Sequence, residues 1–174
     1  MTKRIDLKNK IRNIPDFPKP GILFRDITTL LGDKEAFKQA IDALAAEYKN
    51  KKIDKVVAVE ARGFILGGAI AHKIGAGFVP VRKKGKLPWK TKSATYSLEY
   101  GTDELHMHHD AINPGENVLI VDDLLATGGT AKAVIDLVSG SEGKIAGIAF
   151  LIELTDLKGI EKLKGFPVYS LIKF

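Results

Sequence analysis

The chain has 174 residues, of which 45% are apolar and 28% charged. These values are ordinary for a globular protein, and the length predicts a single domain over residues 1–174 that can build its own core. The chain contains no cysteine, which excludes disulfides, thiolate-bound zinc, iron–sulfur clusters and cysteine nucleophiles. Lysine and arginine exceed aspartate and glutamate by 27 − 21 = 6, so anionic partners are favoured, whether nucleic acids or phosphorylated metabolites.

The N-terminal part of the chain is rich in residues that break helices. Pro15, Pro18, Pro20 and Gly21 exclude a regular helix over residues 16–26. We expect residues 1–32 to form an irregular hood over a sheet edge. Residues 1–8, MTKRIDLK, carry charges with no apolar core behind them, unlike a signal peptide. No apolar stretch approaches the roughly 20 residues that cross a bilayer, so we expect a cytoplasmic protein.

Residues 33–174 carry the pattern of an α/β core. Apolar side chains at three- and four-residue spacing predict an amphipathic helix over residues 33–49. Short apolar runs then alternate with helical patterns, which is typical of a parallel sheet covered by helices on both faces. The fold class is therefore α/β. The predicted strands are 55–60, 77–82, 118–121 and 145–154, and the predicted helices are 64–74 and 130–138.

Two further segments depart from this alternation. Residues 94–109 interleave apolar and polar side chains, which predicts a half-exposed antiparallel excursion. Basic residues gather at 49–55 and at 82–92. We expect the first group to be a solvated surface, and the second to be a loop because Gly85 and Pro88 interrupt it.

The segment at 118–130, VLIVDDLLATGGT, carries the chemistry. Asp122 and Asp123 follow a buried strand, and ligands of open parallel sheets bind beyond the carboxyl ends of strands. The next residues open a helix, where free N–H groups and the helix dipole bind anions. Its glycines let the backbone approach a phosphate, and its threonines add hydroxyl donors. The proposed phosphate contacts are Ala126, Thr127, Gly128, Gly129 and Thr130.

Other nucleotide motifs do not fit. A Walker sequence is absent, because Gly85-Lys86 is followed by leucine. A dinucleotide fingerprint fails, because Gly75 and Gly77 follow a helix and position 80 is proline. A solvated strand end with an ordinary helix cap remains open for the acid pair on its own.

The whole run resembles the signature of the type I phosphoribosyltransferases, which have an apolar strand, two acids and an Ala/Thr-Gly-Gly-Thr loop. Four more segments resemble the adenine phosphoribosyltransferases within that family, in the family's order, and the resemblance spans residues 15–131. Glu60 is a departure, since many relatives carry an aspartate there. The segments are 17–27, FPKPGILFRDI; 60–64, EARGF; 82–88, RKKGKLP; and 96–101, YSLEYG.

The resemblance implies a parallel sheet flanked by helices, an N-terminal hood and a flexible antiparallel lid within residues 82–109. It implies transfer of 5-phosphoribosyl from phosphoribosyl pyrophosphate to adenine, giving AMP and pyrophosphate in purine salvage. Mg²⁺ would be held mainly by the substrate, with no direct protein ligand. A homodimer is implied, in which some bases enter from the neighbouring subunit.

The residue types suit this chemistry. Breaking the anomeric bond builds positive charge on the ribose and negative charge on pyrophosphate. Asp122 and Asp123 can face the ribose, and four bases can face pyrophosphate: Arg62, Arg82, Lys83 and Lys86. The resemblance assigns adenine to Leu23, Phe24 and Arg25, with Phe24 stacking on the base. It makes Glu99 a general base or stabiliser at the purine and Tyr100 a lid residue.

Some interpretations stay open. His106, His108 and His109 lack the ligand set of a metal site and are expected at the surface near the lid hinge. The runner-up function is another purine phosphoribosyltransferase, using xanthine, hypoxanthine or guanine. A regulator that binds phosphoribosyl pyrophosphate and nucleic acid without catalysis is a further alternative. A Mg²⁺ hydrolase built on the acid pair is weaker still.

Overall fold

The computed structural model describes residues 5–97 and 102–174. The chain divides into two compact units, residues 1–43 and 44–174, with the boundary inside a helix.

The first unit contains a small antiparallel sheet. Strand β1 (Arg12–Ile14) pairs with β2 (Phe24–Asp26), and the prolines predicted to break helices lie between them. The expectation that residues 1–32 are irregular is therefore wrong at these two strands, which are too short to show a period in the sequence. The unit also contains the 3₁₀ helix η1 (Lys8–Lys10), helix α1 (Thr28–Leu31) and most of α2 (Lys34–Ala46).

Asp26 and Asp33 hold this unit together. The Arg12 guanidinium donates two hydrogen bonds to Asp26 Oδ2, at 2.9 and 2.7 Å. Hydrogen bonds from Thr28, together with Arg12, lower the pKa of Asp26 to about 2. Asp33 caps α2, because its Oδ1 accepts a hydrogen bond from the Ala36 N–H at 3.1 Å.

The second unit is built on one mixed sheet with the strand order β5-β6-β4-β3-β7-β8-β9. Five of its strands, from β4 to β9 in that order, are parallel, and β6 is antiparallel to both β4 and β5. The predicted parallel sheet and antiparallel excursion are confirmed. The strands are β3 (Lys55–Val59), β4 (Gly77–Lys83), β5 (Thr91–Ser97), β6 (Thr102–His108), β7 (Asn117–Leu125), β8 (Lys144–Glu153) and β9 (Val168–Lys173).

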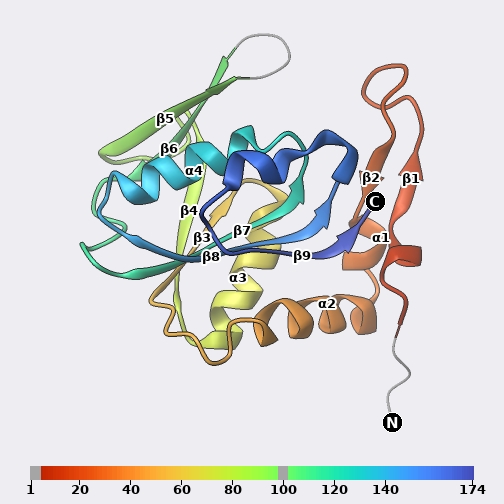
Figure 1. Ribbon diagram of the computed structural model, residues 1–174, viewed down its shortest axis with the longest axis horizontal. Helices are drawn as coiled ribbons and strands as arrows, with labels where there is room; N and C mark the ends of the chain where they lie inside the picture. The colour runs from red at the N-terminus through yellow and green to blue at the C-terminus, as the bar shows by residue number, and fades with distance from the viewer. Residues whose placement is uncertain (1–4, 98–101) are drawn as a thin grey trace. The chain divides into compact units, whose positions relative to one another are not determined.

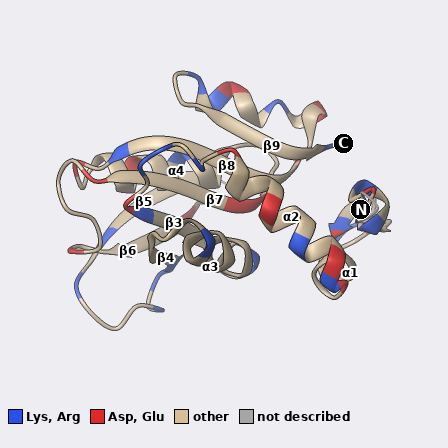
Figure 2. Ribbon diagram, turned by 90° about the horizontal axis from the view of Figure 1, so that it is seen from below, with Lys and Arg blue, Asp and Glu red and all other residues tan. Residues whose placement is uncertain are grey.

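Helices cover both faces of this sheet. Helix α3 (Arg62–Ile74) packs on β3, β4 and β7, and α4 (Gly129–Ser139) packs on β5, β7 and β8. Figure 2 shows the two helices on opposite sides of β3 and β7, and Figure 1 shows α4 running across the front of the sheet. Val57 and Val59 of β3 share one buried cluster with Val134 and Val138 of α4, as a strand buried on both faces requires.

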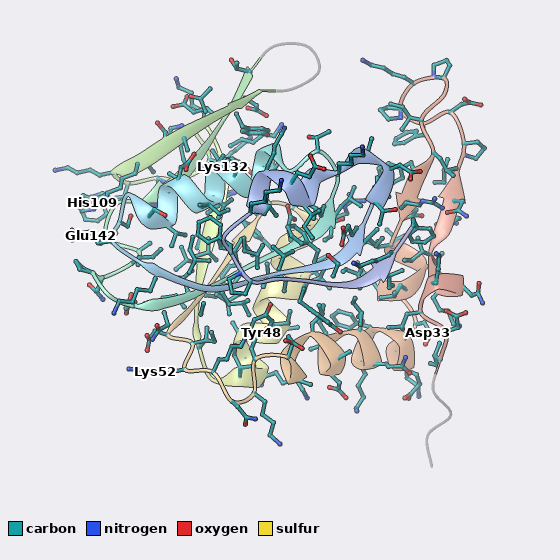
Figure 3. The ribbon with its side chains drawn as sticks, in the orientation of Figure 1. Asp33, Tyr48, Lys52, His109, Lys132 and Glu142 are labelled. Atoms are coloured by element: carbon teal, nitrogen blue, oxygen red, sulfur yellow. The ribbon has the colours of Figure 1, made fainter. Side chains whose placement is uncertain are left out.

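The C-terminal part adds elements that the sequence did not predict. After β8 come the 3₁₀ helices η2 (Thr155–Leu157) and η3 (Gly159–Leu163), and then β9 at the sheet edge. Tyr48, predicted to lie in the helix over 33–49, instead follows α2 and is buried beneath β8, where its ring contacts Gly147 (Figure 3). None of the helices in the described part of the chain has the length and apolar composition of a membrane span.

Candidate active site

The acid pair lies inside β7, near its carboxyl end. Pairing with β8 continues through Asp122 to Leu125, so the expectation that the acids lie beyond the strand is wrong: the ladder carries β7 past the predicted end at Val121. Arg62, the first residue of α3, reaches this pair, and its Nη2 lies 2.8 Å from Asp123 Oδ2. The structure thus brings both acids and one predicted base together.

Burial dominates the electrostatics of the pair. Burial raises the pKa of Asp122 well above its usual range, and the charge of Asp123 raises it further. Burial also raises the pKa of Asp123, although the Arg62 guanidinium opposes this shift. The Asp123 N–H donates a hydrogen bond to Asp122 Oδ1 at 2.9 Å. A positive charge that develops beside these carboxyls would favour their ionised forms.

A glycine loop follows the acids and opens α4. Gly128 has a φ of +79°, in the left-handed region, and the helix begins at Gly129. Residues 124–131 line a small pocket of about 60 Å³ that contains no charged side chain. An anion in this pocket would therefore be held by backbone N–H groups and the helix dipole. Lys132, labelled in Figure 3, follows the pocket and bonds to Asp136 at 2.5 Å.

Glu60 organises a second group of bases. Its Oε2 accepts hydrogen bonds from Arg82 Nε (3.2 Å) and Nη2 (2.9 Å), and its Oε1 accepts one from the Lys83 N–H (2.7 Å). Burial raises the pKa of Glu60, but the hydrogen bonds from Lys83 and Arg82 outweigh it and leave the pKa below the usual value. Sequence reasoning treated Glu60 only as a departure from a motif. No sequence signal places it beside Arg82, because the contact arises from neighbouring strands.

The predicted basic loop is anchored at its start. Arg82 Nη1 donates a hydrogen bond to the Lys86 carbonyl at 3.0 Å, and Lys83 Nζ lies 2.9 Å from Asp103 Oδ2 on β6. The Lys86 side chain is exposed. Of the four predicted bases, the structure places Arg62 at the acid pair and joins the other three in one stretch of β4 and its loop.

Tyr96 is a residue whose contacts sequence reasoning missed. Its hydroxyl donates a hydrogen bond to Asp103 Oδ2 at 3.2 Å and also interacts with the Thr130 side chain. Tyr96 therefore links β5 both to the Lys83–Asp103 pair and to the start of α4. The alternating pattern identified Tyr96 only as an apolar position.

The other predicted site residues are Glu99, Tyr100, Leu23, Phe24 and Arg25. Glu99 and Tyr100 lie outside the described residues. Leu23, Phe24 and Arg25 belong to the first unit, where Leu23 is exposed and the Phe24 ring packs edge-on against Phe17 at 5.1 Å. Arg25 Nη1 bonds to the Asn13 side chain.

The expectation of surface histidines is wrong for two of the three. The His106 side chain is 14% exposed, and its Nδ1 lies 2.9 Å from Thr91 Oγ1. His108 is half-buried, and its Nε2 is buried. Pairing of β6 with β5 covers both. His109 is exposed and contacts the Trp89 ring at 5.2 Å.

Comparison with known proteins identifies the class. The phosphoribosyl transferase domain family matches residues 28–171. The chain belongs to this family, as its fold and its acid-pair and glycine-loop motif indicate.

The individual relatives are adenine phosphoribosyltransferases. The chain is 58% identical over 176 residues to that of Bradyrhizobium sp. strain ORS 278, covering 100% of this chain and 98% of the relative. The crystal structure of the Thermoanaerobacter pseudethanolicus protein has 53% identity and a TM-score of 0.95, with 97% and 98% of the two chains covered. The Saccharomyces cerevisiae protein, solved with an imino-altritol bisphosphate and adenine, has 43% identity and a TM-score of 0.90, with 95% and 96% covered. The resemblance drawn from the sequence is confirmed.

Proposed function

We propose that this protein is a pentosyltransferase of purine salvage. It transfers 5-phosphoribosyl from phosphoribosyl pyrophosphate to adenine and releases AMP and pyrophosphate. One observation carries the proposal: the pair Asp122–Asp123, of which Asp123 is buried, meets Arg62 shortly before a glycine loop that opens α4. The adenine bound to the yeast relative supports the choice of base.

The acid pair and the glycine loop bind different parts of the donor. The bond between the anomeric carbon and pyrophosphate breaks as the carbon bonds to a purine nitrogen, and positive charge builds on the ribose. Asp122 and Asp123 accept hydrogen bonds from the 2′ and 3′ hydroxyls and stabilise this charge. The backbone of residues 126–130 and the hydroxyls of Thr127 and Thr130 bind the 5′-phosphate.

Pyrophosphate is proposed to bind the basic residues. Arg62, Arg82, Lys83 and Lys86 supply charge to the leaving group. Glu60 and Asp103 hold two of these bases in position, and pyrophosphate, with more charge than one carboxylate, would compete for them on binding.

Mg²⁺ is proposed to enter with the donor. Mg²⁺ prefers oxygen ligands, keeps several waters and is commonly held by substrate phosphates. The chain fits such an ion, because carboxylate oxygens suit Mg²⁺ and Asp122 and Asp123 lie side by side in β7, with Asp123 Oδ2 buried and 2.8 Å from Arg62 Nη2. Asp122 and Asp123 would hold the hydrated ion near the pyrophosphate, where it neutralises the charge of the leaving group.

The base and lid residues remain proposals. Phe24 stacks on adenine, while the backbone of Leu23 and Arg25 presents a donor and an acceptor to its edge. Glu99 accepts the proton or the hydrogen bond of the purine nitrogen, and Tyr100 closes the lid.

We also propose a single domain over residues 1–174, a cytoplasmic location and a homodimer. The location follows from the donor, because a pyrophosphate ester is too highly charged to cross a bilayer and the enzyme must share its compartment. The dimer is supported by exposed apolar side chains on α3 and β4, where Ile65 is 46% and Phe78 39% exposed.

The function is tested by product analysis. The protein is mixed with phosphoribosyl pyrophosphate and Mg²⁺ and, in parallel, with adenine, hypoxanthine, guanine or xanthine. We expect AMP and pyrophosphate from adenine at the highest kcat/KM. A higher kcat/KM for another purine would make that purine the preferred substrate. The absence of pyrophosphate release with every purine would contradict the transferase function.

A further inference from the structure

The segment after β8 touches the phosphate loop, residues 126–130, backbone to backbone. A Cβ on Gly128 would lie 2.5 Å from the Gly159 carbonyl oxygen. A Cβ on Gly159 would overlap the Ala126 carbonyl oxygen and lie 2.9 Å from the Gly128 nitrogen. Gly159 does not have a left-handed φ, so the space at this contact, and not the backbone conformation, requires a glycine.

The segment that carries Gly159 is firmly attached on both sides. The Leu154 N–H donates to the Leu125 carbonyl at 2.9 Å, and Thr155 donates to the Phe174 carbonyl through its N–H (2.9 Å) and its hydroxyl (2.7 Å). Leu163, at the end of η3, is 1% exposed and belongs to the same buried cluster as Val134 of α4. A steric conflict at Gly159 would therefore be relieved mainly by movement of the phosphate loop.

We propose that Gly159 is a positioning residue: because it has no side chain, its backbone packs directly against the phosphate loop and fixes the position of that loop. The inference rests on the proposed function, because it assumes that this loop binds the 5′-phosphate. The Gly128 N–H is one of the donors at the start of α4, and hydrogen bonds weaken steeply when donors are displaced. A methyl group at position 159 displaces both this N–H and the Ala126 carbonyl without touching the ligand.

The test compares AMP with adenosine, which lacks only the phosphate. Calorimetry measures both affinities for the unaltered protein, for Gly159→Ala and for a control, Gly77→Ala. In the control, at the opposite end of the sheet, the atom nearest the new Cβ belongs to the flexible Lys55 side chain, 3.2 Å away, and the Asp54 carbonyl oxygen lies at an ordinary contact distance of 3.6 Å. We expect Gly159→Ala to reduce the preference for AMP over adenosine at least tenfold and the control to keep it. General destabilisation would weaken both ligands alike, so an unchanged preference in folded Gly159→Ala overturns the inference.

A second measurement needs no variant. Hydrogen exchange of the unaltered protein with AMP should slow at residues 159–163 together with residues 128–130, whereas adenosine should slow neither. Protection confined to 128–130 would overturn the inference, even if Gly159→Ala does not fold. If the unaltered protein neither binds AMP nor consumes adenine, the proposed function is wrong, and so is this inference, which depends on it. If the unaltered protein does both, and Gly159→Ala keeps the preference for AMP over adenosine, only the proposed role of Gly159 is wrong.

Discussion

Asp122 and Asp123 are neighbours in the sequence, and Asp123 forms an ion pair with Arg62 at 2.8 Å. Because burial and Asp123 raise the pKa of Asp122, the folded protein binds that proton more tightly than the unfolded chain. The carboxyl therefore favours folding below its unfolded value of 3.8, and this contribution is lost as the pH rises through the folded pKa. Ionisation of these two acids in the folded protein therefore lowers its stability.

The first prediction follows from the raised pKa of Asp122. Asp122→Asn cannot ionise, so we expect its Tm to exceed that of the parent near neutral pH and the difference to shrink toward pH 4. Turnover should fall about a hundredfold or more, because the variant loses an acid that we propose faces the ribosyl charge. Asp123→Asn should gain less stability, because it also removes the partner of Arg62. Thermal unfolding against pH checks the order, and equal shifts in the two variants would contradict it.

The second prediction concerns Gly128. Gly128→Ala places a Cβ in a left-handed conformation and against the Gly159 carbonyl, so we expect AMP affinity to fall at least tenfold and stability by about 1–3 kcal/mol. Gly75→Ala is the matched control, since Gly75 has a φ of +74° with nothing within 4 Å of its Cβ. It should lose about 1 kcal/mol and bind AMP normally. Weaker AMP binding in both variants would mean that backbone strain alone is responsible.

At the scale of elements, the Tyr96 hydroxyl adds a polar link from β5 and β6 to the start of α4, beyond the packing of α4 on β5. Tyr96 contacts Asp103 and Thr130, so β5, the Lys83–Asp103 pair and the phosphate loop share a hydrogen-bonded connection. A movement of these strands would be transmitted through Tyr96 to the residues that we propose hold the donor.

The third prediction removes that hydroxyl. Tyr96→Phe should raise the KM for phosphoribosyl pyrophosphate several-fold while unfolding stability changes by about 1 kcal/mol, the worth of one hydrogen bond. Thr95→Ala, an exposed position on the same strand, is the control. Steady-state kinetics separates the two, and an unchanged KM in Tyr96→Phe would remove this connection from catalysis.

Strong local patterns account for the elements that could be predicted from the sequence. The apolar run of β7 predicted a buried strand, the periodicity of α4 predicted a helix, and the alternation of β5 and β6 predicted an antiparallel pair. The three-residue strands β1 and β2 are too short to show a hydrophobic period, and the half-buried strand β9 shows only a weak one. Glu60 holds Arg82 because Val59 pairs with Val81 across β3 and β4. Such a contact depends on register between distant segments, which no local pattern encodes.

At the scale of the whole molecule, α3 and β4 both expose large apolar side chains. Phe64 and Phe78 pack edge-on at 5.6 Å beside exposed Ile65, and large exposed apolar side chains that gather in one place mark interaction sites.

The fourth prediction tests this surface as the dimer interface. Sedimentation should give the parent twice the chain mass, and Ile65→Glu should give a monomer with reduced turnover, since burying an unpaired charge opposes association. Leu157→Glu alters an equally exposed apolar residue on η2 and should remain dimeric. A dimeric Ile65→Glu would exclude α3 as the interface.

The strand order also has a consequence for how the chain reaches this structure. β3 and β7 are hydrogen-bonded neighbours at the centre of the sheet, yet β4, β5 and β6 all lie between them in sequence. Folding must close this long loop before the central pair forms, and such non-local pairing slows folding far more than it lowers stability. Because the closure cost grows only with the logarithm of loop length, lengthening the connection between β5 and β6 would cost a few tenths of a kcal/mol. The length of the connection between β5 and β6 can therefore vary with little effect on folding.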